Sequence, residues 1–175
     1  MMRKLLLIGV LIMALLATGC KEFKQQSTSE SNLPWKVDQF ADLYVMRYEI
    51  PDWDSLSLQQ KELCYYLSQA ALCGRDILWD QNYEHNLAIR HILEAIYEGY
   101  TGERMGTNWE AFLVYLKRVW FSNGIHHHYG ETKILPEFPI SYFQELVNKT
   151  PADKFPEELG EASAIISFAT PIMFD

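Results

Sequence analysis

Apolar residues recur every three or four positions along most of the chain after Ser57, which is the spacing of one helix face. Ser57 and Gln60 fit a capping box, so a first helix is expected to start there and to run through QQKELCYYLSQAALCGRDILWD. It is expected to pack on the core through one stripe of apolar side chains, namely Leu63, Leu67, Ala70, Ala71 and Leu78.

Three more helices are predicted downstream, at about residues 84–98, 108–123 and 141–148. The first of these stops at Gly99, and Gly124 suits a left-handed cap at the end of the second. The second helix has the clearest apolar stripe, which consists of Phe112, Leu113, Leu116, Val119 and Trp120.

Strand patterns are few. Apolar and polar residues alternate from Tyr44 to Ile50, and the segment TKIL at residues 132–135 is a second candidate strand. The body of the chain, residues 36–150, is therefore expected to be mainly α with one or two short strands. The pattern weakens beyond it, so residues 151–175 remain an unassigned tail.

Cys64 and Cys73 fall within the first predicted helix, nine residues apart. That spacing turns a helix through about two and a half turns and separates the residues by roughly 13 Å, so their side chains point to opposite faces. A disulfide needs Cα atoms no more than about 7 Å apart. We therefore expect both cysteines to be small core residues without a disulfide.

The N-terminus has the features of a targeting signal. Arg3 and Lys4 precede the apolar run LLLIGVLIMALLAT, which is too short to span a bilayer as a permanent helix. Small residues then lead to Cys20 in ATGC, and this order resembles a bacterial lipoprotein signal peptide, in which the cysteine is diacylated. The alternative is an ordinary cleaved signal peptide with an incidental cysteine.

The lipoprotein resemblance implies a signal peptide over residues 1–19 and a lipid-anchored tether over residues 20–35. The lipid bilayer is then a partner of the chain through acylated Cys20, because two acyl chains anchor a protein stably. The expected location is the cell envelope, on the periplasmic or surface side.

The net charge and the absence of common motifs exclude several functions. The chain carries a net charge of −8 at pH 7, whereas binding to nucleic acid needs a basic face. It contains no H-E-x-x-H, no G-x-S-x-G and no phosphate-loop motif. Asp76 and Asp80 are expected to be solvated or salt-bridged, and His91 with Glu94 is too small a set for a metal site.

Two segments resemble a known enzyme family. They are YYLSQAALCGRDILWDQ, which begins at Tyr65, and AFLVYLKRVWFSNGIHHHYGETKILPEF, which begins at Ala111. In the second, an aromatic residue, a glycine, an acid and Thr-Lys follow at residues 129–133. Both are similar to the N-terminal region of the dipeptidyl peptidase III family, zinc exopeptidases that release dipeptides from peptide N-termini. The similarity runs from about Phe40 to Phe138.

The resemblance does not extend to the zinc site of the family. Its members hold zinc with the two histidines of H-E-x-x-G-H and a glutamate of E-E-x-x-A-[DE]. This chain has no His-Glu pair, and its EELGEA places Glu161 where alanine should stand. The chain thus resembles only the N-terminal part of a larger two-lobed α+β peptidase. We expect no catalytic residue and no cofactor in this chain, although the full-length family binds zinc.

The three histidines at residues 126–128 could form either a metal site or a binding surface. In an extended segment side chains alternate, so His126 and His128 would share a side and His127 would point away. No third ligand is evident nearby, so no metal site is predicted. The resemblance implies that this segment borders the cleft where the peptide binds. His128 and Tyr129 are therefore expected to contact the N-terminal end of the substrate, and the alternative is a loop packed only on its own lobe.

Three functions remain open at this point. The chain is expected to be the N-terminal segment of a zinc-dependent dipeptidyl peptidase, inactive alone because it lacks the zinc motifs. The second possibility is a free-standing anchored module that binds peptides. The third is a structural envelope lipoprotein.

Overall fold

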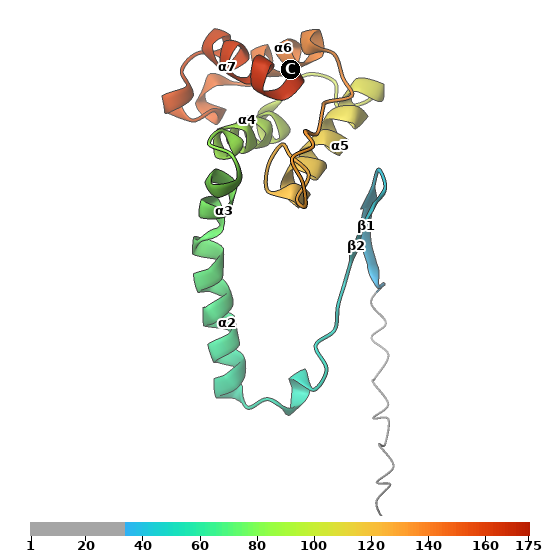
Figure 1. The fold of residues 1–175 in the computed structure, drawn as a ribbon, viewed down its shortest axis with the longest axis vertical. Helices are drawn as coiled ribbons and strands as arrows, with labels where there is room; N and C mark the ends of the chain where they lie inside the picture. The colour runs from blue at the N-terminus through green and yellow to red at the C-terminus, as the bar shows by residue number, and fades with distance from the viewer. Residues whose placement is uncertain (1–33) are drawn as a thin grey trace, which may run out of the picture. The chain divides into compact units, whose positions relative to one another are not determined.

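The fold is that of a computed structural model of the chain, which describes residues 34–175 (Figure 1). The expected signal peptide, Cys20 and most of the tether lie outside these residues. Residues 35–175 form one unit. Its elements are β1 (Lys36–Phe40), β2 (Leu43–Met46), α2 (Leu58–Cys73), α3 (Arg75–Asn82), α4 (Asn86–Gly99), α5 (Thr107–Ser122), α6 (Ile140–Asn148), α7 (Ala162–Phe174) and the 3-10 turns η1 (Trp53–Ser55), η2 (Ala152–Lys154) and η3 (Glu157–Leu159).

Most of the hydrophobic core comes from the four helices α4 to α7, and it is completed by Trp79 of α3 and by connecting residues that include Ile125, Phe138 and Phe155. The predicted mainly helical class with one or two short strands is confirmed for the described residues. Of the stripe predicted on α5, Phe112, Leu116 and Val119 are fully buried. Phe112 contacts the rings of Trp109 and Phe138, so aromatic packing joins α5 to the segment that precedes α6.

Residues 151–175, which the sequence pattern left unassigned, contain an ordered helix that completes the core. In α7, Ile165, Ala169 and Met173 are buried at a spacing of four residues. The helix is apolar on most of its surface, which weakens the helical periodicity that a sequence reading depends on. It packs beside α6, where the ring of Phe174 contacts that of Phe143.

The two strands form an antiparallel hairpin that is attached to α5 through side chains. Predicted alternation extended to Ile50, but pairing ends at Met46, and β1 is a strand that the sequence pattern did not predict. The Lys117 ammonium donates to the Asp38 carboxylate at 2.6 Å, and the Arg118 guanidinium donates to Asp42 at 2.7 Å. A two-stranded sheet is marginally stable by itself. The two ion pairs to α5 therefore help to stabilise the hairpin.

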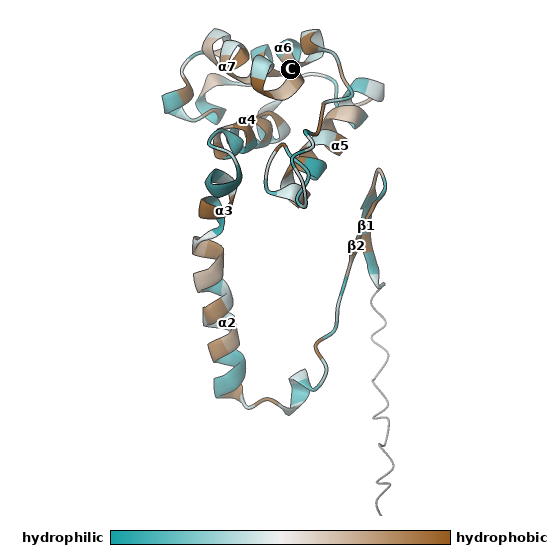
Figure 2. Ribbon diagram, in the orientation of Figure 1, coloured by the Kyte–Doolittle hydropathy of each residue, from teal (hydrophilic) through white to brown (hydrophobic). Residues whose placement is uncertain are grey.

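Helix α2 begins as predicted and then differs from the prediction in its burial. The capping box is present, with the Ser57 hydroxyl accepting from Gln60 N–H and the Gln60 side chain accepting from Ser57 N–H. The single predicted helix is divided at Gly74, a residue of low helix propensity, into α2 and α3. No residue of α2 is buried. Figure 2 shows that hydrophobic and hydrophilic residues alternate along this helix.

Two predictions about this region are therefore wrong. The expected core stripe on the first helix is exposed along its length, and Leu63, Leu67 and Leu78 are each more than half exposed. Cys64 and Cys73 are free, as expected, but both are exposed and so are not core residues. Among the described residues, Lys61 of α2 contacts Asp54 and Trp53 of η1, but no packing buries any side chain of α2.

Candidate functional site

The loop after α5 is set by one buried polar side chain from α4. Asn86 is 1% exposed, and its Nδ2 donates to the Trp79 carbonyl at 3.2 Å while its Oδ1 accepts from Ile125 N–H at 3.0 Å. Both polar atoms of the amide are thus satisfied, which removes the cost of burying them. The bonds join the ends of α3 and α5 to the start of α4.

Helix α5 ends in a left-handed residue, as predicted, but one position earlier. Asn123 adopts that conformation with φ 52°, and Gly124 follows with φ 156°. A Cβ atom added at Gly124 would lie 2.3 Å from Asn86 Nδ2, closer than side-chain carbons approach other atoms. Glycine is needed here both for its backbone angle and for the close approach of Asn86.

The histidine segment forms a tight turn closed by backbone hydrogen bonds. Ile134 N–H donates to the Ile125 carbonyl at 2.7 Å, and His127 N–H donates to the Thr132 carbonyl at 2.8 Å. His126 pairs with Lys133 as a single antiparallel bridge. The TKIL strand predicted from sequence is therefore reduced to one bridge, because the turn closes after too few residues to continue the pairing.

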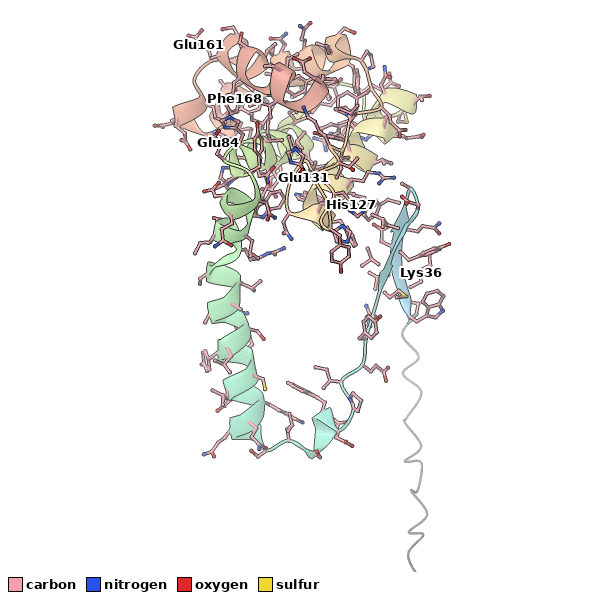
Figure 3. All side chains as sticks on the ribbon, viewed as in Figure 1. Lys36, Glu84, His127, Glu131, Glu161 and Phe168 are labelled. Atoms are coloured by element: carbon pink, nitrogen blue, oxygen red, sulfur yellow. The ribbon has the colours of Figure 1, made fainter. Side chains whose placement is uncertain are left out.

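The turn lies beside a hollow of about 370 Å³, which we call the histidine hollow. Figure 3 labels His127 and Glu131, which lie on this turn after α5. Such a volume is within the range of small-molecule sites, roughly 300–1,000 Å³. The hollow is lined by Asn82, Asn86, Ser122, Asn123, Gly124, His126, His127, His128, Gly130 and Glu131.

Only one of the two residues predicted to contact the substrate lines the histidine hollow. His128 lines the hollow, whereas Tyr129 is 89% exposed and lies outside the lining. All three histidines line the hollow, so the expected alternation that turned His127 away is wrong. The turn between His127 and Thr132 replaces the extended backbone on which the alternation was based.

Ring contacts hold the histidines in place on the turn. The His128 ring meets the Phe121 ring edge-on at a centroid distance of 5.1 Å, and it contacts the Tyr129 ring at 4.2 Å. His127 stacks on His128 at 4.6 Å. Such aromatic pairs restrict the rotamers of exposed side chains, which lowers the entropy lost when a ligand binds.

The lining determines what the hollow can bind. Its side chains are amides, a hydroxyl, imidazoles and one carboxylate, so it suits a small polar molecule that makes several hydrogen bonds. Within residues 34–175, no group of three or more His, Cys, Asp or Glu side chains is placed to hold a metal ion.

A second hollow, which sequence reasoning missed, has tyrosines and glutamates from two places: Tyr100 and Glu103 between α4 and α5, and Tyr142 and Glu145 on α6. The Tyr100 hydroxyl donates to Glu145 at 3.1 Å. Burial raises the pKa of Tyr142 to about 12, and burial together with Glu145 raises the pKa of Tyr100. The Lys149 ammonium and Tyr100 lower the pKa of Glu145. The tyrosines are thus protonated at neutral pH, and the cluster acts as a structural hydrogen-bond network.

The other chemical candidates from the sequence serve structural roles. Asp76 accepts from Arg90 at 2.9 Å, which agrees with the salt bridge expected for it. Glu94 accepts from Arg90 at 2.8 Å and from Trp120 Nε1 at 2.9 Å, so its carboxylate is used by its own fold. Neither carboxylate belongs to the histidine hollow.

No protein-family model matches the chain, and no curated protein sequence matches it. Among the residues that the structure describes, no helix is long and apolar enough to cross a membrane.

Proposed function

We propose that the chain is the N-terminal segment of a zinc-dependent exopeptidase that releases dipeptides from peptide N-termini. In this role it supplies part of the substrate cleft and is inactive alone. The observation that carries the proposal is the histidine hollow, which lies within the segment most similar to the dipeptidyl peptidase III family. Its size and polar lining suit the backbone amides and free amino end of a short peptide.

The residues of the hollow would bind and orient the peptide without taking part in bond cleavage. The Glu131 carboxylate is the formally charged side chain of the lining and would attract an ammonium group. The imidazoles and the Asn123 amide would exchange hydrogen bonds with peptide groups. Tyr129, exposed at the turn, would contact the peptide beyond the hollow.

A complementation assay tests this function. The full chain, held in lipid nanodiscs, is mixed with the remainder of a dipeptidyl peptidase III enzyme that carries both zinc motifs. Hydrolysis of a dipeptidyl arylamide is expected only from the mixture. His128→Ala should raise KM about tenfold with little change in kcat, since it removes a binding contact. His91→Ala, outside the hollow, is the matched control.

Two results would contradict the proposal. One is hydrolysis by the chain alone, or stoichiometric zinc retained after purification without an affinity tag. The other is a mixture that forms a complex but has no activity, which would leave a free-standing peptide-binding lipoprotein as the better account.

The proposed location is the cell envelope, with the chain anchored through an acylated Cys20. Cys20→Ser is expected to move the protein from the membrane fraction to the soluble fraction, because the two acyl chains are lost and a diacyl anchor is what makes attachment stable. Membrane fractionation and mass measurement of the N-terminal peptide check this. Unchanged membrane retention of the variant, or an unmodified Cys20 in the parent, would refute the anchor.

A further inference from the structure

The imidazole of His127 takes part in closing the turn that carries the three histidines. Its Nδ1 atom accepts a hydrogen bond from the Tyr129 N–H at 3.3 Å, and the Gly130 N–H donates to the His127 carbonyl at 2.9 Å. The first bond is the histidine counterpart of an Asx turn, in which a side-chain oxygen accepts from the N–H two residues further on. A ring nitrogen that accepts carries no proton, so the His127 ring in this structure is neutral, with its proton on Nε2.

Protonation of the His127 ring removes this hydrogen bond. A charged imidazole has an N–H at both ring positions, so Nδ1 becomes a donor that faces the donor of Tyr129. Histidine is the side chain whose charge ordinarily changes between about pH 5 and pH 8. The closure of the turn is therefore coupled to pH through one named atom.

The other titratable groups of the turn add to this effect. The His128 ring stacks on the His127 ring at a centroid distance of 4.6 Å, so two charged rings would repel each other, although solvent weakens the repulsion between exposed groups. His126 lines the same hollow and pairs with Lys133, so both add positive charge when His126 is protonated. Glu131 supplies the opposing negative charge of the lining.

The segments that pack against the turn bring one further titratable ring. The Tyr83 ring contacts both His126 and His85, at centroid distances of 5.3 and 5.1 Å, and so links the turn to the connection between α3 and α4. His85 lies 3.8 Å from the Glu84 carboxylate, which can balance its charge. From α5 the uncharged ring of Phe121 contacts the turn. Protonation thus adds positive charge to the turn faster than the nearby carboxylates can balance it.

We propose that His127 is a pH switch that controls the shape and charge of the histidine hollow. At the upper end of the range in which histidine titrates, the neutral ring closes the turn. At the lower end, the charged ring releases the Tyr129 N–H and the turn loosens. Half of the lining belongs to this turn, namely His126, His127, His128, Gly130 and Glu131, so the hollow changes with it.

The charge of the hollow changes at the same time as its shape. With neutral imidazoles, Glu131 is the formally charged side chain of the lining, and the hollow favours a ligand that carries an ammonium group. With protonated imidazoles the hollow repels such a ligand. The switch needs this chain alone. Under the proposed function, it would release the amino end of a bound peptide when the surroundings become acidic.

Water-exchange NMR on the full chain in nanodiscs tests the switch, with ¹⁵N in histidine and tyrosine only. Between about pH 8 and about pH 5, the exchange rate of the Tyr129 N–H, divided by its intrinsic rate at each pH, should rise about threefold to tenfold, the effect of losing one ordinary hydrogen bond. The His127 N–H, which donates to Thr132, should follow it. A protonated Nδ1 in the His127 ring at about pH 8, or normalised exchange that does not change at either N–H, would overturn the proposal.

Two substitutions of His127 separate the hydrogen bond from general effects of acid. His127→Asn places an amide oxygen where Nδ1 stands and does not titrate, so exchange at Tyr129 should stay slow at both pH values. His127→Ala has no acceptor and should exchange fast at both. The control, His128→Asn, removes the stacked ring but keeps the acceptor, so the response to pH should remain.

These variants also identify the outcomes that contradict the switch. A response to pH that persists in His127→Asn would show that another group controls the turn. Loss of the response in His128→Asn would show that ring stacking, and not the bond to Tyr129, closes it. Both histidines are exposed, so circular dichroism should show all three variants folded. Because the measurement uses no peptide and no second protein, its result is independent of the complementation assay.

Discussion

Gly124→Ala should destabilise the fold by about 2–4 kcal/mol, the range of a strained backbone residue combined with a steric clash in a packed site. The glycine has φ 156°, and a Cβ there would approach three atoms of the Asn86 amide within 2.3–2.7 Å. Asn86 is buried and holds hydrogen bonds on both sides, so it cannot move away without leaving Trp79 or Ile125 unpaired. Chemical denaturation followed by tryptophan fluorescence measures the loss.

The control for this change lies a few residues further on the same turn. Gly130→Ala meets no atom within 4 Å and should change the free energy of unfolding by less than about 0.5 kcal/mol. Equal stability of the two variants would show that Asn86 does not fix the turn. If the prediction holds, Gly124→Ala should also alter the proton spectra of the three histidines, since the turn that positions them starts beside this residue.

Phe112→Ala should cost about 3–5 kcal/mol, the usual effect of removing a fully buried aromatic side chain. Phe112 has no exposed surface and lies between Trp109 on its own helix and Phe138 before α6. The cavity left behind cannot close easily, because its walls belong to different segments of the chain. Calorimetry of the full chain in nanodiscs should show a lower transition temperature.

Phe121 on the same helix provides a matched comparison. It is 41% exposed and contacts Phe40 of the hairpin and His128 of the turn, so Phe121→Ala should cost less than half as much as Phe112→Ala. A larger effect at Phe121 would mean that the hairpin and the turn contribute more to stability than the helical core. The ordering of the two variants therefore reports where the cooperative core lies.

Local signals in the sequence predicted the helices that carry clear caps and stripes. Ser57 with Gln60 marked the start of α2, and the spacing of Phe112, Leu116 and Val119 marked the buried face of α5. These features depend on neighbours within one or two turns. The exposure of α2 could not be predicted from the sequence. Periodicity shows which side chains could be buried, but it does not show whether another part of the protein covers them. Helix α7 was missed for a related reason, since its apolar residues surround the helix.

The candidate site was predicted in part. The histidine run marked the right segment, and His128 lines the hollow. The contributions of Asn82 and Asn86 could not be found, because they reach the hollow only when the ends of α3 and α4 pack beside the turn. Asn86 carries one usable signal: an asparagine near the start of a strongly apolar helix is a candidate for a buried cap or bridge.

Because α7 completes a core that α4 and α5 begin, this core cannot close until α7 has been synthesised. The ribosome must add the residues from Asn86 to Met173 before the last buried side chain is available. At about 5–20 residues per second this takes roughly 4–17 s. During that interval the apolar surfaces of β2 and α2 have already emerged without a partner. Until α7 has been added, the apolar faces of α4 and α5 also lack part of the packing that buries them in the folded structure.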